Sequence, residues 1–244
     1  MADPIHQFQI SKILPITVGD LDLSFTNSSL WMAIAVACAY YLVMAGTRHK
    51  ALVPGRLQSA VEMLYEFTAG MLRDATGKEG MRYFPWIFTL FMFLLFGNSL
   101  GMIPGSYTFT SQIIVTFTMA AVVIIMVTGL GFYLHGAKFL GFFVPHGAPG
   151  WILPLMVPIE IISYLVRPIS LSVRLFCNMM AGHTMMKVFA GFIVSLGSYY
   201  LVPGIFPMAI TVLLTGFEIV VAILQAYIFT VLTCLYLNDA IHMH

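Results

Sequence analysis

Charged and polar side chains recur at helical spacing inside a long apolar stretch of this sequence. Glu160, Arg167 and Arg174 are spaced by seven residues, so on a helix they share one face with the polar side chains between them. The full stripe is Glu160, Ser163, Arg167, Ser170, Arg174 and Asn178. An arginine at the centre of a membrane helix costs about 2.5–3.5 kcal/mol on insertion scales, so such a residue is retained where it is functional or paired. The stripe therefore predicts a site that handles charge.

A second group of polar residues follows in the next apolar segment. If the two segments form an antiparallel hairpin that turns near residue 200, residues at equal depth have numbers that sum to about 400. The predicted pairs are Arg174 with Gln225, His183 with Glu218, and Glu160 with Asp239. His183 lies nine residues beyond Arg174, on the opposite side of an ideal helix. The arginine and the histidine are therefore expected to serve separate places.

A charge-handling role is one interpretation of His183 and Glu218, as it is for the polar stripe on the preceding segment. Two other interpretations remain open, a structural hydrogen-bonded pair and a metal site that lacks a third ligand. Arg174 has no acid at its own depth on this chain, so its partner is expected on another subunit. Arg167 and Lys187 could instead extend to the membrane interface.

Composition defines the surroundings of these charges. Of the 244 residues, 60% are apolar and 9% are charged, against about 45–50% and about 25% in soluble domains. Mean hydropathy is +0.94, so the chain is predicted to be an integral membrane protein. The net charge of +1 without a basic patch argues against nucleic acid as a partner. Three scattered cysteines, Cys38, Cys177 and Cys234, are interpreted as buried thiols and not as a disulfide framework or metal site.

Apolar runs of helix length predict an all-α polytopic membrane protein with about five membrane-embedded helices. They cover residues 29–46, 84–103, 113–135, 151–200 and 205–237, the last two joined by residues 202–204. A single helix over 208–237 is about 45 Å long against a hydrocarbon core of about 30 Å, which predicts a strongly tilted hairpin. Residues 57–77 carry apolar side chains on one side and polar side chains on the other, which predicts an amphipathic interfacial helix. The predicted division is an outer segment 1–28 and one membrane domain 29–244, whose hairpin covers 151–240.

The distribution of basic residues predicts the topology. Six basic residues lie between Arg48 and Arg82, whereas Lys12 is the one basic residue before the first span. Basic loops are retained in the cytoplasm, so the N-terminus is expected outside and the C-terminus inside. Asp3 stands where a signal peptide would carry a basic residue, so the N-terminal segment does not resemble a secretion signal.

The segment SLSVRLFCNMMAG at 170–182 resembles the signature of subunit a of F-type ATP synthases, in which a small-x-small-apolar-Arg-Leu-x-small-Asn pattern recurs. Cys177 departs slightly from that pattern, which has glycine, alanine or serine at its position. Further similarity covers PIHQF at 4–8, GNSLGMIP at 97–104, and the segment from Glu218 through QAYIFT at 225–230 to Leu237. The arginine motif and the glutamine motif occur at the separation seen in that family.

The resemblance implies a static, non-catalytic subunit beside a rotating ring of small proteolipid subunits c, each with a membrane-buried carboxylate, and a peripheral-stalk subunit b. Two aqueous half-channels would reach the ring carboxylate from opposite sides. By this likeness Arg174 is the essential arginine between the half-channels and Gln225 lies near it. The remaining proton-path residues would be His183, Glu218 and Asn98 on the outer side, Glu160 and Asp239 on the inner side, and Asn178 beside the arginine. Neither a cofactor nor a metal is implied.

The implied setting is the plasma membrane of a bacterium, with the mitochondrial inner membrane as the alternative. Asn98 could equally make an ordinary hydrogen bond between helices. Two other classes remain as alternatives. A stand-alone ion channel or secondary transporter would also carry charges at the midplane, although it would often show inverted repeats, and none is found. A membrane-embedded hydrolase would need a nucleophile with a base or a metal triad, and no such spacing occurs.

Overall fold

The computed structural model describes residues 9–15, 17–18, 21–22, 24–48, 51, 53–103, 105–144, 152–199 and 201–242. The motif at 4–8 and Pro104 of the motif at 97–104 lie outside the described residues. Within the described part, five helices are long and apolar enough to cross a membrane, which confirms the predicted all-α polytopic class. They are α1 (Asn27–Thr47), α3 (Phe84–Gly101), α4 (Ile113–His135), α5 (Leu153–Tyr199) and α6 (Leu201–Ile241).

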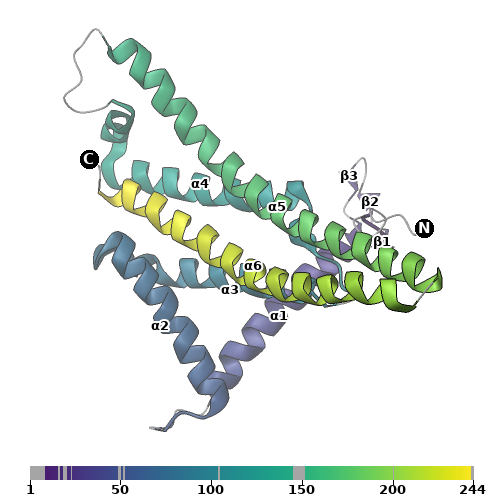
Figure 1. Ribbon diagram of the computed structural model, residues 1–244. Helices are drawn as coiled ribbons and strands as arrows, with labels where there is room; N and C mark the ends of the chain where they lie inside the picture. Colours follow the sequence, from purple (N-terminus) through teal and green to yellow (C-terminus); the bar gives the residue numbers. More distant parts are fainter. Residues whose placement is uncertain are drawn as a thin grey trace.

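The two longest helices, α5 and α6, form the hairpin. They have 47 and 41 residues, or about 70 Å and about 60 Å of helix, and they make the most extensive helix contact in the described fold. Figure 1 shows them side by side and oblique to α3 and α4. The turn near residue 200 is confirmed, but the expected joint at 202–204 is wrong, because α6 begins at Leu201. Proline is tolerated in the first turn of a helix, where its missing N–H has no intrahelical partner.

Helix α2 (Arg56–Thr76) is amphipathic, as its sequence pattern predicts. Its buried residues include Val61, Ala69 and Leu72, and it packs against α1, α3 and α6. It ends at Gly77, whose φ of +67° lies in the left-handed region that glycine adopts without strain. A short 3-10 helix, η2 (Glu79–Tyr83), then leads into α3. The helix thus places a polar face opposite the bundle.

The segment before α1 contains short strands that the sequence pattern does not predict. They pair antiparallel, β1 (Lys12–Leu14) with β4 (Phe25–Thr26) and β2 (Thr17–Val18) with β3 (Leu21–Asp22). Two 3-10 helices flank α4, η3 (Phe109–Ser111) before it and η4 (Gly136–Phe143) after it. In Figure 1 the strands lie at the same end of the molecule as the α5–α6 turn, and α6 ends at the opposite side.

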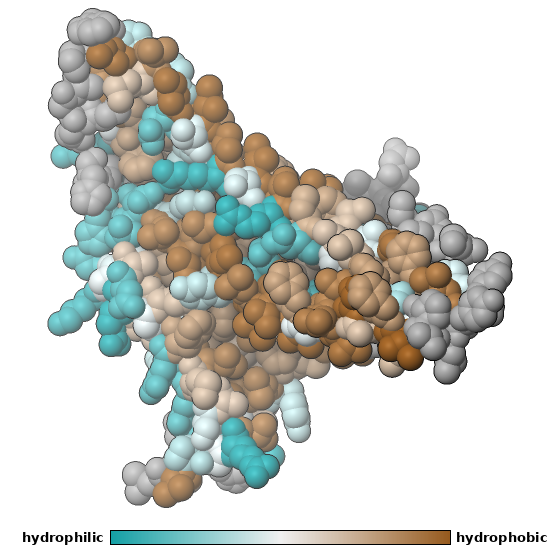
Figure 2. Space-filling model, in the orientation of Figure 1, coloured by the Kyte–Doolittle hydropathy of each residue, from teal (hydrophilic) through white to brown (hydrophobic). Residues whose placement is uncertain are grey.

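The hydrophobic core lies where α3, α4, α5 and α6 meet. Phe91 of α3, Val123 of α4, Leu175 and Met179 of α5, and Phe229 of α6 are each buried within one cluster. Most of the outer surface is also apolar, and hydrophilic residues gather over the middle of α5 and α6 and near the end of α6 (Figure 2). An apolar exterior with a polar band along the hairpin is the arrangement expected where polar function lies inside a membrane.

Candidate functional site

The centre of the site is a buried pair of side chains across the α5–α6 hairpin. Nε2 of His183 lies 3.8 Å from Oε1 of Glu218, and the two residues are 9% and 4% exposed. The contact confirms that the two residues lie at the same depth. In the described part of the chain neither carboxylate oxygen of Glu218 has a hydrogen-bond partner. A buried carboxyl without such partners needs a proton or water, so this position suits proton exchange.

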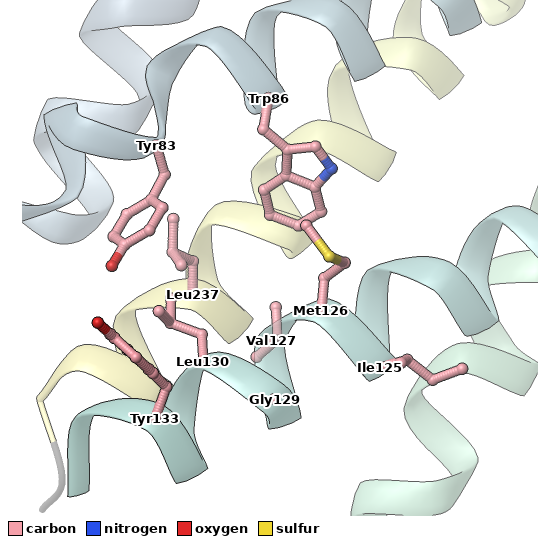
Figure 3. Close-up of a pocket in the computed structure, with 9 residues that line it drawn as sticks. All are labelled: Tyr83, Trp86, Ile125, Met126, Val127, Gly129, Leu130, Tyr133 and Leu237. Atoms are coloured by element: carbon pink, nitrogen blue, oxygen red, sulfur yellow. The ribbon is translucent and has the colours of Figure 1, made fainter.

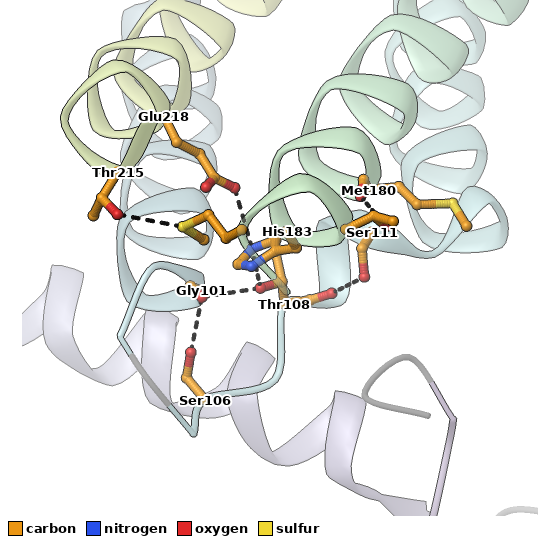
Figure 4. Close-up of polar contacts among 10 residues, drawn as sticks. Gly101, Ser106, Thr108, Ser111, Met180, His183, Thr215 and Glu218 are labelled. Carbon is orange, nitrogen blue, oxygen red and sulfur yellow. Dashed lines mark hydrogen bonds and ion pairs between the residues drawn. The ribbon is translucent and has the colours of Figure 1, made fainter. Parts of the chain in front are cut away.

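The histidine is held by the segment that links α3 to η3. Oγ1 of Thr108 lies 2.9 Å from Nε2 of His183, and the same hydroxyl lies 3.1 Å from the carbonyl oxygen of Gly101 (Figure 4). The carbonyl of Gly101 also accepts a hydrogen bond of 2.9 Å from the hydroxyl of Ser106. Sequence reasoning did not identify Thr108, because a single threonine in a connecting segment carries no periodic signal.

Two hollows adjoin the His183–Glu218 pair. The first, of about 400 Å³, is lined by the end of α3, by Ser106 and Thr108, and by His183 and Lys187 of α5. The second, of about 410 Å³, lies between α5 and α6 and is lined by Glu218, Asn178 and Gln225. The pair therefore separates a hollow at the end of α3 from one that extends toward the arginine motif.

Gly182 allows this close approach of α6 to α5. A β-carbon at Gly182 would lie 2.5 Å from Oε1 of Glu218. The absence of a side chain at this position therefore provides the space that the carboxylate occupies. Gly182 ends the motif at 170–182, but the sequence did not indicate this role, since it depends on which α6 residue faces the glycine.

Arg174 is exposed on α5, one helical turn before the half-buried Asn178. Among the described residues no carboxylate lies within 4 Å of its guanidinium and no side-chain hydrogen bond joins it to a neighbour. Gln225, which was expected at the same depth, is 6% exposed on α6. Thus the arginine faces outward from the hairpin, and the amide lies within it.

Arg167 and Asp239 form the second charged contact of the hairpin. Nη1 of Arg167 lies 2.8 Å from Oδ2 of Asp239, and its guanidinium lies over the rings of Tyr164 and Tyr236 at 5.5 Å and 5.3 Å. The sequence predicts that Asp239 lies at the depth of Glu160. The observed partner, Arg167, lies two helical turns further along α5. A long arginine side chain spans several residues of helical rise, so equal depth of α-carbons does not determine its partner. Within the described regions, the half-buried Glu160 makes neither an ion pair nor a side-chain hydrogen bond.

Asn98 is fully buried in α3 and lines neither of these two hollows. Its Nδ2 donates a hydrogen bond of 3.1 Å to the backbone carbonyl of Ala222 in α6. Its Oδ1 has no partner among the described residues. The contact matches the alternative of an ordinary hydrogen bond between helices.

A third hollow, of about 300 Å³, lies between α3, α4 and α6 near the end of α6 (Figure 3). Its lining includes Tyr83, Trp86 and Tyr133, and none of its lining residues is charged. A surface of this composition has no group that exchanges protons near neutral pH, so this hollow is separate from the charged site.

The sequence that forms this hairpin and its charged groups matches one known family. The model of the ATP synthase A chain family matches residues 29–238. This chain belongs to that family. It is 58% identical to ATP synthase subunit a of Allorhizobium ampelinum over 243 residues, which cover 98% of this chain and 97% of the relative.

Two further relatives extend the comparison. ATP synthase subunit a of Chelativorans sp. is 58% identical over 98% of both chains, and that of Paramagnetospirillum magneticum is 53% identical over the full length of both. The family match includes the site residues from Asn98 of α3 to Gln225 of α6, and it ends one residue before Asp239. The resemblance that the arginine motif indicates is thereby confirmed.

Proposed function

We propose that this chain is the stationary proton-conducting subunit of a rotary F-type ATP synthase. The observation that carries the proposal is the exposure of Arg174 on a membrane-length helix with no carboxylate of the described residues within 4 Å. A guanidinium in hydrocarbon is costly unless it is paired. A carboxylate on a neighbouring subunit provides that pair, and a rotating ring of small proteolipid subunits c presents one such carboxylate after another.

Arg174 controls the charge of the ring carboxyl in this proposal. The carboxyl is neutral while it faces lipid, because an ion there is unfavourable, and it is ionised beside the guanidinium, which favours the charged form. The arginine itself keeps its proton, so protons cannot pass through it from one half-channel to the other. Each elementary charge that crosses the membrane supplies about 2.3 kcal/mol per 100 mV, which drives the rotation.

The outer half-channel runs through the two hollows that adjoin His183 and Glu218. Protons enter at the end of α3, pass the histidine and the carboxyl, and continue toward Gln225 and Asn178. The supporting observations are the 3.8 Å contact of the pair and its position between the two hollows. Asn98 packs α3 against α6 in this proposal and does not line the channel, since it contacts the backbone of Ala222.

The inner half-channel starts at the other end of the hairpin, near Glu160 and Asp239. The ion pair with Arg167 fixes the Asp239 carboxylate in place, whereas Glu160 is half-buried without an ion-pair partner in the described regions. Glu160 is therefore the proposed acceptor of protons that leave the ring.

The chain is a multi-pass membrane protein, and its relatives from bacteria support a bacterial plasma membrane as its location. We assign the strand segment to the outer side and the end of α6 to the cytoplasm. This assignment is supported by the basic residues between Arg48 and Arg82 and by the position of the strands opposite the end of α6 in Figure 1.

Purification from native membranes tests the proposed assembly. The chain should copurify with a ring of small proteolipid subunits and with the stalk subunit b, and replacing Glu218 with glutamine should slow proton entry. A chain that purifies alone and conducts ions when reconstituted alone would favour the stand-alone channel. A Glu218→Gln complex that pumps at the wild-type rate at all pH values would exclude the carboxyl from the path.

A further inference from the structure

The hydroxyl of Thr108 lies between two groups that compete for its single hydrogen. Thr108 is 5% exposed, with Nε2 of His183 at 2.9 Å and the carbonyl oxygen of Gly101 at 3.1 Å. When the hydroxyl donates to Gly101, its oxygen accepts a hydrogen from Nε2 of the histidine. When Nε2 carries no hydrogen, the hydroxyl can turn and donate to the ring nitrogen instead.

Ser106 makes this second orientation possible. Its hydroxyl donates to the same carbonyl of Gly101 at 2.9 Å, so the carbonyl keeps one hydrogen bond when Thr108 turns away (Figure 4). The carbonyl belongs to the last residue of α3, where backbone oxygens have no partner within the helix. Both protonation states of Nε2 are therefore satisfied without moving the backbone.

Gly101 permits the close contact. A β-carbon at this position would lie 2.5 Å from Oγ1 and 2.7 Å from Cγ2 of Thr108. The threonine therefore packs against the backbone at the end of α3, and its side chain fills the space that a side chain at 101 would occupy. Gly101, Ser106 and Thr108 form one unit that faces the histidine.

We propose that Thr108 is a positioning residue for the proton relay, and that its hydroxyl turns between Gly101 and His183 each time Nε2 loses or regains a proton. The proposal rests on the proposed proton path. In the forward step Nε2 releases its proton to the carboxylate of Glu218, and the hydroxyl then donates to the free nitrogen. When a proton from the outer side returns to Nε2, the hydroxyl turns back to Gly101. The O–H bond of Thr108 does not break in either step.

Charged groups approach His183 from both helices of the hairpin. Glu218 approaches from α6 at 3.8 Å, and Lys187 lies one turn further along α5 and lines the same hollow. Among the residues that line this hollow, His183 and Lys187 are the two with titratable side chains. A change at Thr108 therefore alters the hydrogen bonding of the ring without removing a charge from its surroundings.

Replacing Thr108 with valine removes the hydroxyl and keeps the shape. In the complete synthase in native inverted vesicles, ATP-driven pumping by this variant should slow by about threefold to tenfold, the effect of one lost hydrogen bond. The curve of rate against pH should shift to higher pH, because the deprotonated Nε2 loses its donor whereas the protonated ring keeps the attraction of the Glu218 carboxylate at 3.8 Å. Thr108→Ser should restore the wild-type curve. Ser106→Ala should also slow pumping, since the carbonyl oxygen of Gly101 then loses its second donor.

Thr110 provides a matched control. It is fully buried two residues away, and its hydroxyl has no hydrogen-bond partner among the described residues, so Thr110→Val should leave pumping unchanged. Wild-type pumping and pH dependence in Thr108→Val, or equal slowing in Thr108→Ser and Thr110→Val, would overturn the inference. If Thr108→Val does not assemble, an unchanged Ser106→Ala complex overturns it independently. Wild-type pumping in Arg174→Ala is a different result, which rejects the proposed function itself.

Discussion

Gly182 of α5 faces the carboxylate of Glu218 so closely that a β-carbon on the glycine would lie 2.5 Å from Oε1 and 2.7 Å from Cδ. Glycine inside a helix is less stable than alanine by about 0.5–1 kcal/mol, so this position is unfavourable for the helix taken alone. In return, the missing side chain leaves room for the carboxyl beside His183. The geometry of the buried pair thus depends on a residue that takes no part in its chemistry.

Alanine at position 182 should displace the Glu218 carboxyl, because the added methyl group occupies its place. The carboxyl ends a flexible side chain, so we expect the subunit to assemble while ATP-driven proton pumping in vesicles falls severalfold. The control is Gly191→Ala on the same helix, where no described atom lies within 4 Å of the added carbon. This control should pump normally. Normal pumping by both variants would show that the position of Glu218 is not critical.

The hydrogen bond from Asn98 to Ala222 should stabilise the contact of α3 with α6. We expect Asn98→Leu to lower the stability of the folded subunit, and so of the complex, by about 1 kcal/mol, as for other hydrogen bonds between membrane helices. The pH dependence of pumping should not shift. Thermal dissociation in detergent measures the first effect and pumping assays measure the second. Thr89→Val, which removes an exposed hydroxyl bonded within its own helix, serves as the control. A normally assembled Asn98→Leu complex with slow, pH-shifted pumping would return Asn98 to the proton path.

The effects on stability of replacing Arg167 and Asp239 should not be additive, because the two residues form one contact. Both side chains are partly exposed, at 26% and 36%, so the ion pair and the two tyrosine contacts together stabilise by about 1–2 kcal/mol. Arg167→Gln should lower the dissociation temperature, and adding Asp239→Asn should lower it little further. Lys138→Gln, at an exposed position without an ion pair in the described regions, should have no effect. Additive losses would mean that the two residues act independently.

Sequence spacing was sufficient to predict the membrane-length helices and the central pair. Helix α4 begins and ends at the predicted residues, 113 and 135, because its apolar run is bounded on both sides by polar or glycine residues. The predicted pairing of His183 with Glu218 agrees with the observed contact. Both residues lie near the turn of the hairpin, where small errors in register have not accumulated.

Contacts that depend on long side chains or on connecting segments could not be predicted in this way. Asp239 pairs with Arg167 and not at the depth of Glu160, since this end of the hairpin is far from the turn and an arginine spans several residues of helical rise. Thr108 lies in a segment between helices, where no periodicity indicates direction. The short strands before α1 are equally unmarked, because two-residue pairings have no alternating pattern to detect.

The central claim is that Arg174 pairs with a carboxylate of another subunit and separates two proton paths. The most direct measurement is ATP-driven proton pumping by the complete synthase in native inverted vesicles that carry Arg174→Ala, with subunit content checked by immunoblotting. Our account predicts normal membrane insertion and assembly with no pumping, because the ring carboxyl is no longer ionised at its crossing point. Wild-type pumping by the assembled Arg174→Ala complex would contradict it.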